Sequence, residues 1–346
     1  MRSMNDLGRR LAATGAALLV LGACADSVTE APARVAAAAA AAVEDVSVEA
    51  LPSVNFRSLI DTITNGVIAD STNQYDIPSI NAVSAFRQAV DSVLAGRWVG
   101  ADRQLDFYGY DVYRIRESVS GDTMIIFRER VNATTGRVPR GWGTYAYNPR
   151  HVRRTDIEVN HPVSDQHTED IGAELYRDCR CRWFAMAGAE RDANHTDMSS
   201  DVAHYTGGPT VFNHVHMHLH FTEAHENARV LSLHGFLESR HASLPDSVDM
   251  VLSNGRSARS TVPVYGTSEP VLRTRLRNGG WEAGLFNVDA GYNELGGDNL
   301  QGRWDNNNLG FGHWMHIEIE RNVREDPTRW RAMNTIIRQW ILDFPT

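Results

Sequence analysis

The chain has 346 residues, of which 42% are hydrophobic, enough for one large folded domain with additional segments. Its formal net charge is −9 at pH 7. An acidic balance without a basic patch argues against a nucleic-acid partner, but it does not exclude an anionic substrate, because binding depends on local charge.

The first residues have the features of a bacterial export signal. Three arginines precede residues 11–23 (LAATGAALLVLGA), an apolar run that is too short to span a membrane. The run ends in LGAC (21–24), which resembles the lipobox of bacterial lipoproteins. We therefore predict a lipoprotein signal peptide over residues 1–23. An ordinary secretory signal with a chance cysteine is the alternative.

The lipobox resemblance implies cleavage before Cys24 and lipidation of that cysteine. Ala25, rather than Asp, follows it, and by analogy with lipoprotein sorting this favours an outer-membrane anchor in the bacterial cell envelope. The removed segment holds three Arg and one Asp, so the net charge of −9 would become about −11. Export also implies an oxidising compartment.

Two segments precede the main domain. Residues 24–53 are Ala-rich and of low complexity, and we interpret them as a tether. Residues 54–103 have apolar spacing suited to short helices, and we predict a helical N-terminal extension. Its clearest helix is SAFRQAVDSVLAGRW (84–98), where Ser84 can cap the start and Gly96 can end the helix.

From residue 104 to 346 the pattern alternates between strands and helices. Helices are predicted over 167–178, 209–227 and 326–344. This alternation predicts an α/β domain with a largely parallel or mixed sheet. Strands are predicted over residues 110–118, 122–131, 142–150, 155–161, 182–190, 228–236, 247–255 and 313–321.

Residues 211–221 read VFNHVHMHLHF, with four histidines at alternate positions. As a strand, this segment would gather four imidazoles on one face. As a helix, Phe212, Val215 and Leu219 share an apolar face, and the strand-like ARVLSLHGF follows it. We predict the helix, with most of these histidines at the surface or in a second layer, and His216 as the one that could turn toward a site. Cys179 and Cys181, in DCRCRW, are interpreted as structural.

Metal-ligating and catalytic residue types follow several predicted strands, the place where α/β folds build their sites. His161 ends one strand and is followed by a loop with Asp165, His167 and Glu169. A catalytic zinc site takes three His or carboxylate ligands and leaves one position open. Candidates at the other strand ends are His234 before Gly235, the alternating pair Glu318 and Glu320, and Arg191 with Asn194.

In this order and context, IEVNHPVSDQHTED, VLSLHGF and IEIERNVR resemble zinc-dependent amidohydrolases with a carboxypeptidase-like fold. The pattern is similar to poly-γ-glutamate hydrolases and N-formylglutamate amidohydrolases over roughly residues 140–342. The resemblance implies an α/β, three-layer carboxypeptidase-like (phosphorylase/hydrolase-like) mixed sheet with flanking helices. It also implies that residues 104–346 form a metallohydrolase-like domain.

Carried over by residue, the resemblance implies that His161 and His234 bind Zn²⁺, with Asp165 as the carboxylate ligand and Glu169 as the alternative. The loop Pro162-Val163-Ser164-Asp165 departs from the Gly-rich loop of the phage enzymes. Glu318 matches the general acid/base, with Glu320 as its neighbour on the same face.

Arg191 and Asn194 resemble the Arg/Asn pair that holds a substrate carboxylate, and Arg191 also belongs to the implied catalytic set. The implied reaction is hydrolysis of an amide bond in a carboxylate-bearing, glutamyl or peptide-like substrate. Zinc would activate a water molecule. Glu318 would take a proton from that water and pass it to the leaving amine.

Two alternatives remain open from the sequence. The chain could be a catalytically inactive envelope lipoprotein that acts as a binding or scaffold module, which the altered loop favours. It could also be a metal-sequestering surface protein that uses the histidines of residues 214–220.

Overall fold

The computed structural model describes residues 51–194, 197–204, 210–222, 229–255, 268–310 and 312–343. The predicted signal peptide, Cys24 and residues 25–50 of the predicted tether lie outside the described residues. Among the described helices, none is both long and apolar enough to cross a membrane.

Within the described residues, ten strands form one mixed sheet in the order β1-β2-β3-β4-β6-β5-β7-β10-β8-β9. All eight predicted strands are present, and two short strands, β1 and β9, are added to them. The strands are β1 (Ser53–Val54), β2 (Tyr110–Glu117), β3 (Thr123–Glu129), β4 (Thr144–Tyr147), β5 (Arg153–Val159), β6 (Cys181–Met186), β7 (Arg229–Phe236), β8 (Met250–Ser253), β9 (Ala283–Leu285) and β10 (Trp314–Glu320).

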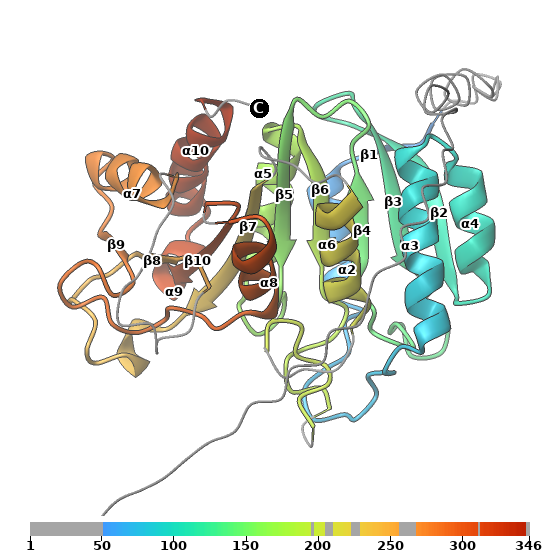
Figure 1. The fold of residues 1–346 in the computed structure, drawn as a ribbon, viewed down its shortest axis with the longest axis horizontal. Helices are drawn as coiled ribbons and strands as arrows, with labels where there is room; N and C mark the ends of the chain where they lie inside the picture. The colour runs from blue at the N-terminus through green and yellow to red at the C-terminus, as the bar shows by residue number, and fades with distance from the viewer. Residues whose placement is uncertain are drawn as a thin grey trace, which may run out of the picture. The chain divides into compact units, whose positions relative to one another are not determined.

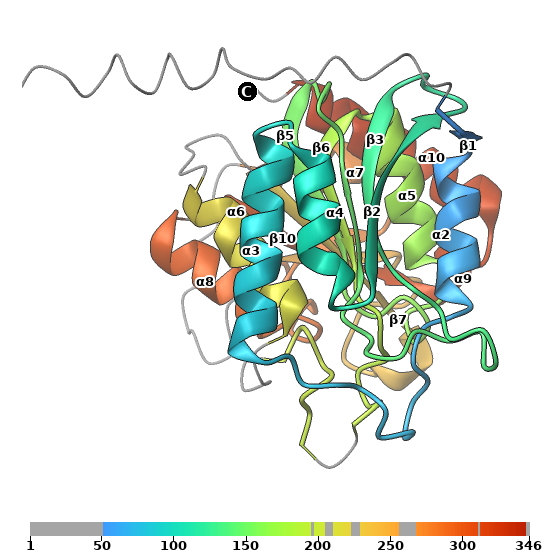
Figure 2. The ribbon, with the colours of Figure 1, turned by 90° about the vertical axis from the view of Figure 1, so that its right-hand side faces the viewer.

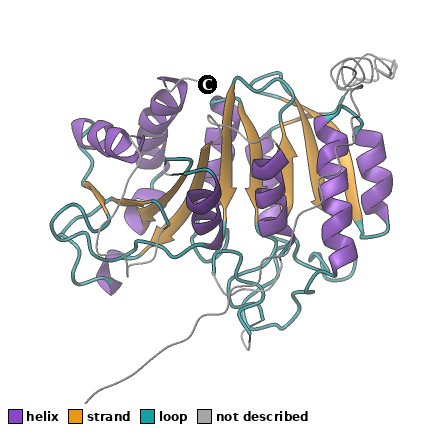
Figure 3. Cartoon of the chain, in the orientation of Figure 1, coloured by secondary structure: helices purple, strands orange, loops and turns teal. Residues whose placement is uncertain are grey.

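The four central strands, β6, β5, β7 and β10, are parallel, whereas β4 and β8 flank them in antiparallel orientation. The carboxyl ends of these four strands therefore lie along one edge of the sheet. Helices cover both faces, so the molecule has three layers (Figures 1 and 3). The predicted fold class, an α/β mixed sheet with flanking helices in three layers, is confirmed.

One face of the sheet is covered by α3 (Ile80–Leu94), α4 (Trp98–Asp106), α6 (Val211–Thr222) and α8 (Leu300–Asn308). Figure 2 shows them on one side and the remaining helices on the other. The opposite layer contains α2 (Phe56–Thr64), α5 (Thr168–Asp178), α7 (Ser268–Asn278), α9 (Arg321–Arg324) and α10 (Pro327–Asp343), and a 3₁₀ turn, η1 (Glu238–Arg240), follows β7.

The two layers have separate apolar cores because strand side chains alternate between the faces. Ile157 and Val159 of β5 lie in the core that includes Trp330 of α10. Trp183 of β6 lies in the other core, together with Leu219 of α6. The polar alternates of β5, Asp156 and Glu158, are on the α6 side and are also buried. Polar groups at that position need partners.

The segment predicted as a helical extension, residues 54–103, contains α2, α3 and most of α4. Helix α3 begins earlier than predicted, because Ser79 is its N-cap and accepts a hydrogen bond from the Ala82 N–H at 3.2 Å. Ser84 lies one turn inside the helix. The predicted end is confirmed, since the helix stops at Leu94 and Gly96 follows at φ +77°.

The histidine run forms helix α6, as predicted, and its apolar residues Phe212, Val215 and Leu219 are buried. His216, expected to be the one that could turn inward, is buried, and His220 is buried as well, so neither is at the surface. His216 and His220 are 3% and 2% exposed, because they face the polar side chains of β5 across the helix–sheet interface. Cys179 and Cys181 are also buried, and no disulfide joins them.

Two glycines allow the loop before β4 to pack closely against the loop that follows β6. Gly143 has φ +100°, and a Cβ there would lie 2.6 Å from the Met186 carbonyl oxygen. Gly188 faces it, and a Cβ at that residue would lie 2.6 Å from the Gly143 nitrogen. This contact fixes the start of the segment that carries Arg191.

We expect Gly143→Ala to destabilise the protein much more than Gly121→Ala. Both residues have positive φ, but a Cβ at Gly121 meets nothing within 4 Å. The conformational cost of about 1–2 kcal/mol applies to both variants. Overpacking adds about 1–3 kcal/mol at Gly143 alone. The free energy of unfolding in urea measures the difference, and equal losses in the two variants would contradict the close approach.

Candidate metal centre

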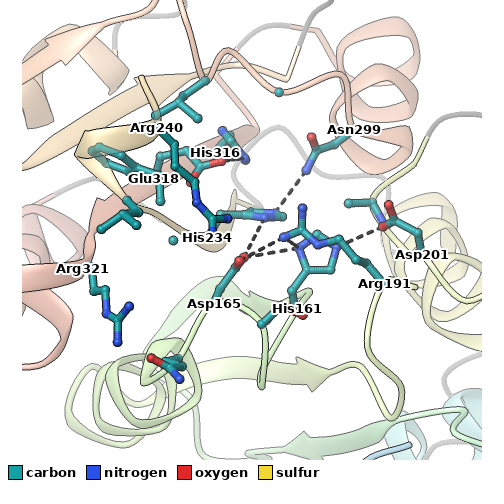
Figure 4. A pocket seen from close by; sticks show the side chains of 18 of the residues that line it. His161, Asp165, Arg191, Asp201, His234, Arg240, Asn299, His316, Glu318 and Arg321 are labelled. Atoms are coloured by element: carbon teal, nitrogen blue, oxygen red, sulfur yellow. Dashed lines mark hydrogen bonds and ion pairs between the residues drawn. The ribbon is translucent and has the colours of Figure 1, made fainter. Parts of the chain in front are cut away.

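Five of the predicted site residues, His161, Asp165, Arg191, His234 and Glu318, meet at the carboxyl ends of the four parallel strands. They line a cavity of about 770 Å³, at the edge where α/β folds place their sites. His161 follows β5, His234 lies near the end of β7, Glu318 lies near the end of β10, and Arg191 follows β6. Figure 4 shows these side chains pointing toward one another.

Three buried side chains converge on one point. His161 Nδ1 and His234 Nδ1 lie 3.2 and 3.4 Å from the same oxygen, Asp165 Oδ2. Each side chain is at most 5% exposed. Asp165 reaches this place because the loop after β5 turns back, and its N–H donates to the His161 carbonyl at 2.9 Å.

These distances suit a shared metal ion. Ligands bound tetrahedrally to zinc at 2.0–2.1 Å are separated from one another by about 3.3 Å. The three ligand atoms also all lie within 4.8 Å of one another. Two imidazoles and one carboxylate can therefore hold a divalent cation and leave a coordination position open toward the cavity.

The outer nitrogens of both imidazoles have partners that fix the rings. His161 Nε2 lies 2.9 Å from Asp201 Oδ1. The Asn299 amide nitrogen lies 3.2 Å from His234 Nε2, and Ser232 Oγ, 3.2 Å from the same nitrogen, can accept its N–H. Histidine ligands in metal sites are oriented by such contacts at the nitrogen that does not bind the metal.

The surroundings of the site keep Asp165 and Asp201 ionised and His234 neutral. Burial raises the pKa of Asp165, but hydrogen bonds from His161 and His234 outweigh it and leave the pKa well below its usual value. Burial also raises the pKa of Asp201, but the hydrogen bond with His161 outweighs it and lowers that pKa to about 2. Burial lowers the pKa of His234 to about 4, so its nitrogen is available as a ligand at neutral pH.

Glu318 is the backbone neighbour of His234 in the register of β7 and β10. Burial, followed by the charge of Asp165, raises the pKa of Glu318 to about 8. Its Oε2 has no hydrogen-bond partner among the described residues. A carboxyl group with these properties can take up and release a proton near neutral pH.

His316, two residues before Glu318 on the same strand face, adds a third imidazole. Its Nε2 lies 3.4 Å from Glu318 Oε1, and its ring centroid is 4.4 Å from that of His234. Burial lowers the pKa of His316 well below its usual value. His234, His316 and Glu318 are therefore a second set of ligands that could hold a cation in the same cavity.

Two arginines have different roles at the site. Arg191 Nη2 lies 2.9 Å from His161 Nδ1 and donates to Asp165 Oδ1 at 3.0 Å, while its side chain is 40% exposed. Arg324 donates to the main-chain carbonyls of Ile319, Gln166 and Phe236. Arg324 thus ties the Asp165 loop to the ends of β7 and β10.

Three predicted residues lie elsewhere. Asn194 is not among the cavity residues, and its amide bonds to the Tyr75 backbone and to Ser199. Glu169 lies in the first turn of α5, outside the ligand cluster. Glu320 caps α9 by accepting from the Asn322 N–H, and it also accepts from the Glu238 N–H. The structure does not bring these three into the site.

The sequence reasoning missed His316, Asp201 and Asn299. His316 had a usable signal, because it alternates with Glu318 on a predicted strand and must share its face. Asp201 is 40 residues from His161 and lies in a loop with no pattern of its own. Asn299 is the N-cap residue of α8, a helix that was not predicted.

No protein-family model and no curated protein matches the sequence. Solved structures with a similar arrangement include an N-formylglutamate amidohydrolase from Ralstonia eutropha JMP134, with 14% identity, a TM-score of 0.37, and coverage of 58% of this chain and 95% of that one. A bacteriophage poly-γ-glutamate hydrolase has 9% identity, a TM-score of 0.35, and coverage of 56% and 86%. A metallo-carboxypeptidase from Burkholderia cenocepacia has 12% identity, a TM-score of 0.34, and coverage of 73% and 67%.

Proposed function

We propose that this chain is a zinc-dependent hydrolase of an amide bond in a carboxylate-bearing, glutamyl or peptide-like substrate. The observation that carries the proposal is the convergence of His161 Nδ1 and His234 Nδ1 on Asp165 Oδ2, beside the partly desolvated Glu318. Two imidazoles and one carboxylate are a donor set of catalytic zinc sites, and the cavity leaves the fourth coordination position open.

In this proposal, His161, Asp165 and His234 would hold Zn²⁺, which supplies Lewis acidity and lowers the pKa of water. Glu318 takes the proton from the attacking water at its carboxylate and gives it to the leaving amine nitrogen. Its burial supports this role, because a pKa near neutrality serves both proton uptake and proton release. Asp201 holds the His161 ring during the reaction.

Arg191 is the proposed contact for the substrate carboxylate. Its guanidinium is at the cavity wall and partly exposed, so it can form two parallel hydrogen bonds to an incoming carboxylate. Arg240 and Arg321 line the same cavity and add two further positive charges to its wall. Asn194 has no part in this proposal.

The ligand assignment predicts different results for the two candidate carboxylates. Asp165→Asn, His161→Ala and His234→Ala should each lose the zinc held at this centre, because the alanine variants remove a ligand nitrogen and Asp165→Asn removes the negative charge of the carboxylate ligand. Glu169→Gln, the matched control, should keep it. Metal content per chain, by plasma mass spectrometry on protein without a histidine tag, makes the comparison. Zinc lost in Glu169→Gln but retained in Asp165→Asn would move the ligand to Glu169.

Glu318→Gln should keep the metal and lose turnover. General acid–base catalysis contributes about 10²–10⁴-fold, so kcat should fall by that factor. Glu320→Gln is the control, because Glu320 caps α9 and lies outside the cluster. The assay is amine release from glutamyl amides. Unchanged kcat in Glu318→Gln would rule out its role as the base.

One observation favours a second candidate, a catalytically inactive binding or scaffold module. Arg191 Nη2 is within hydrogen-bond distance of both His161 Nδ1 and Asp165 Oδ1, so a permanent cation neutralises part of the ligand set. In that case the centre of the unmodified chain binds no metal in zinc-containing buffer, and Arg191→Ala, which removes the competing cation, allows zinc to bind. Zinc binding at His161 in the unmodified chain would reject the inactive module.

We also propose that the chain is anchored in the bacterial envelope through lipidated Cys24, facing the periplasm and most consistent with the outer membrane. The support is the LGAC sequence and the preceding apolar run. Labelled palmitate should be incorporated into the unmodified chain and not into Cys24→Ser. Equal labelling of both would contradict the anchor. At that location, cell-wall peptides are the proposed substrates.

A further inference from the structure

A second pair of imidazoles lies inside the protein, on the helix that carries the histidine run. His216 and His220 are one turn apart on α6, and both are buried. They meet Asp305 of α8, whose side chain is fully buried. The cluster shares no residue with the centre at Asp165, and its three ligand atoms lie within 4.8 Å of one another.

The geometry of this cluster repeats that of the first centre. His216 Nε2 and His220 Nδ1 lie 3.3 and 2.9 Å from the same oxygen, Asp305 Oδ1. These distances are close to the separation of about 3.3 Å between tetrahedral zinc ligands. Two histidines one helical turn apart also form a recognised zinc-binding pair, because their rings project from one face.

The outer nitrogens are again held by carboxylates, now from β5. His216 Nδ1 lies 2.7 Å from Glu158 Oε1, and His220 Nε2 lies 3.2 Å from Asp156 Oδ2. Arg182 in turn donates to Asp156 Oδ1 at 2.9 Å. A carboxylate on the far nitrogen of each imidazole is the arrangement that orients histidine ligands in metal sites.

The cluster has an excess of buried negative charge. Asp156, Glu158 and Asp305 are three carboxylates against the single guanidinium of Arg182, which leaves two negative charges if both imidazoles are neutral. A divalent cation compensates them.

Several polar atoms of the cluster also lack partners. Glu158 Oε2 and Asp305 Oδ2 are buried and make no hydrogen bond among the described residues, and His216 Nε2 has only its 3.3 Å ion-pair contact with Asp305 Oδ1, which does not meet hydrogen-bond geometry. Buried polar atoms without partners are costly. A bound ion would satisfy His216 Nε2 and the Asp305 carboxylate together.

We propose that His216, His220 and Asp305 bind a second divalent cation of the zinc class, with a structural role. The ion ties α6 and α8 to each other and, through Glu158 and Asp156, to β5. Asn299, the N-cap residue of α8, contacts His234, so the ion also steadies one wall of the first centre. This proposal does not rest on the hydrolase activity.

The test uses His161→Ala, which disables the first centre and leaves the second cluster intact. The full chain is purified without a histidine tag, in mild detergent, exchanged into zinc buffer and then dialysed. Plasma mass spectrometry should find one zinc per chain in His161→Ala. Removing that zinc with EDTA should lower Tm by about 5–10 °C, and zinc should restore it.

Substitutions in the histidine run of α6 show which residues bind the second ion. On the His161→Ala background, His216→Gln should lose the remaining zinc, whereas His214→Gln should keep it, because His214 contacts Arg87 outside the cluster. A His161→Ala chain that folds, holds no zinc and has the same Tm with and without EDTA would overturn the proposal, leaving a network of two imidazolium groups. Failure of the hydrolase proposal would look different, because the unmodified chain and His161→Ala would then hold the same single zinc.

Discussion

The structure depends on how negative charge is neutralised between the sheet and the layer of α6 and α8. Strand alternation places Asp156 and Glu158 of β5 on this face, and Asp165, Asp305 and Glu318 join them from other elements. Buried carboxylates are stable only when they are paired, hydrogen-bonded or bound to a cation. Almost every buried histidine on this face lies beside one of these groups, which is why the chemistry is concentrated here.

The same arrangement of histidines and carboxylates occurs at two places along the sheet. In each cluster, two imidazoles converge on one carboxylate oxygen, and a further carboxylate holds at least one outer nitrogen. At the strand ends, the cluster opens into the cavity with Glu318 and Arg191, which suits catalysis. Deeper in the layer, the cluster around Asp305 is enclosed, which suits a structural ion. The backbone of β5 and helix α8 connect the two.

The central strands and the strand-end residues were predictable because they follow strong local patterns. The alternation of IEVN, VLSLHG and HWMHIEIE gave the strands, and parallel strands bring His161, His234 and Glu318 to one edge. The buried pair in α6 was not predictable in the same way. Burial of His216 and His220 is decided by Asp305 and by the β5 carboxylates, which are distant in sequence. Asp201 and Asn299 are set by loop and cap geometry, for which the sequence has no periodic signal.

Anomalous diffraction at the zinc absorption edge, from crystals of the unmodified chain grown with zinc, tests the central claim most directly. The account predicts a peak within about 2.0–2.2 Å of His161 Nδ1, His234 Nδ1 and Asp165 Oδ2. A well-ordered cavity without a peak, with Arg191 bonded to Asp165 and His161, would contradict the metal centre and the reaction proposed for it.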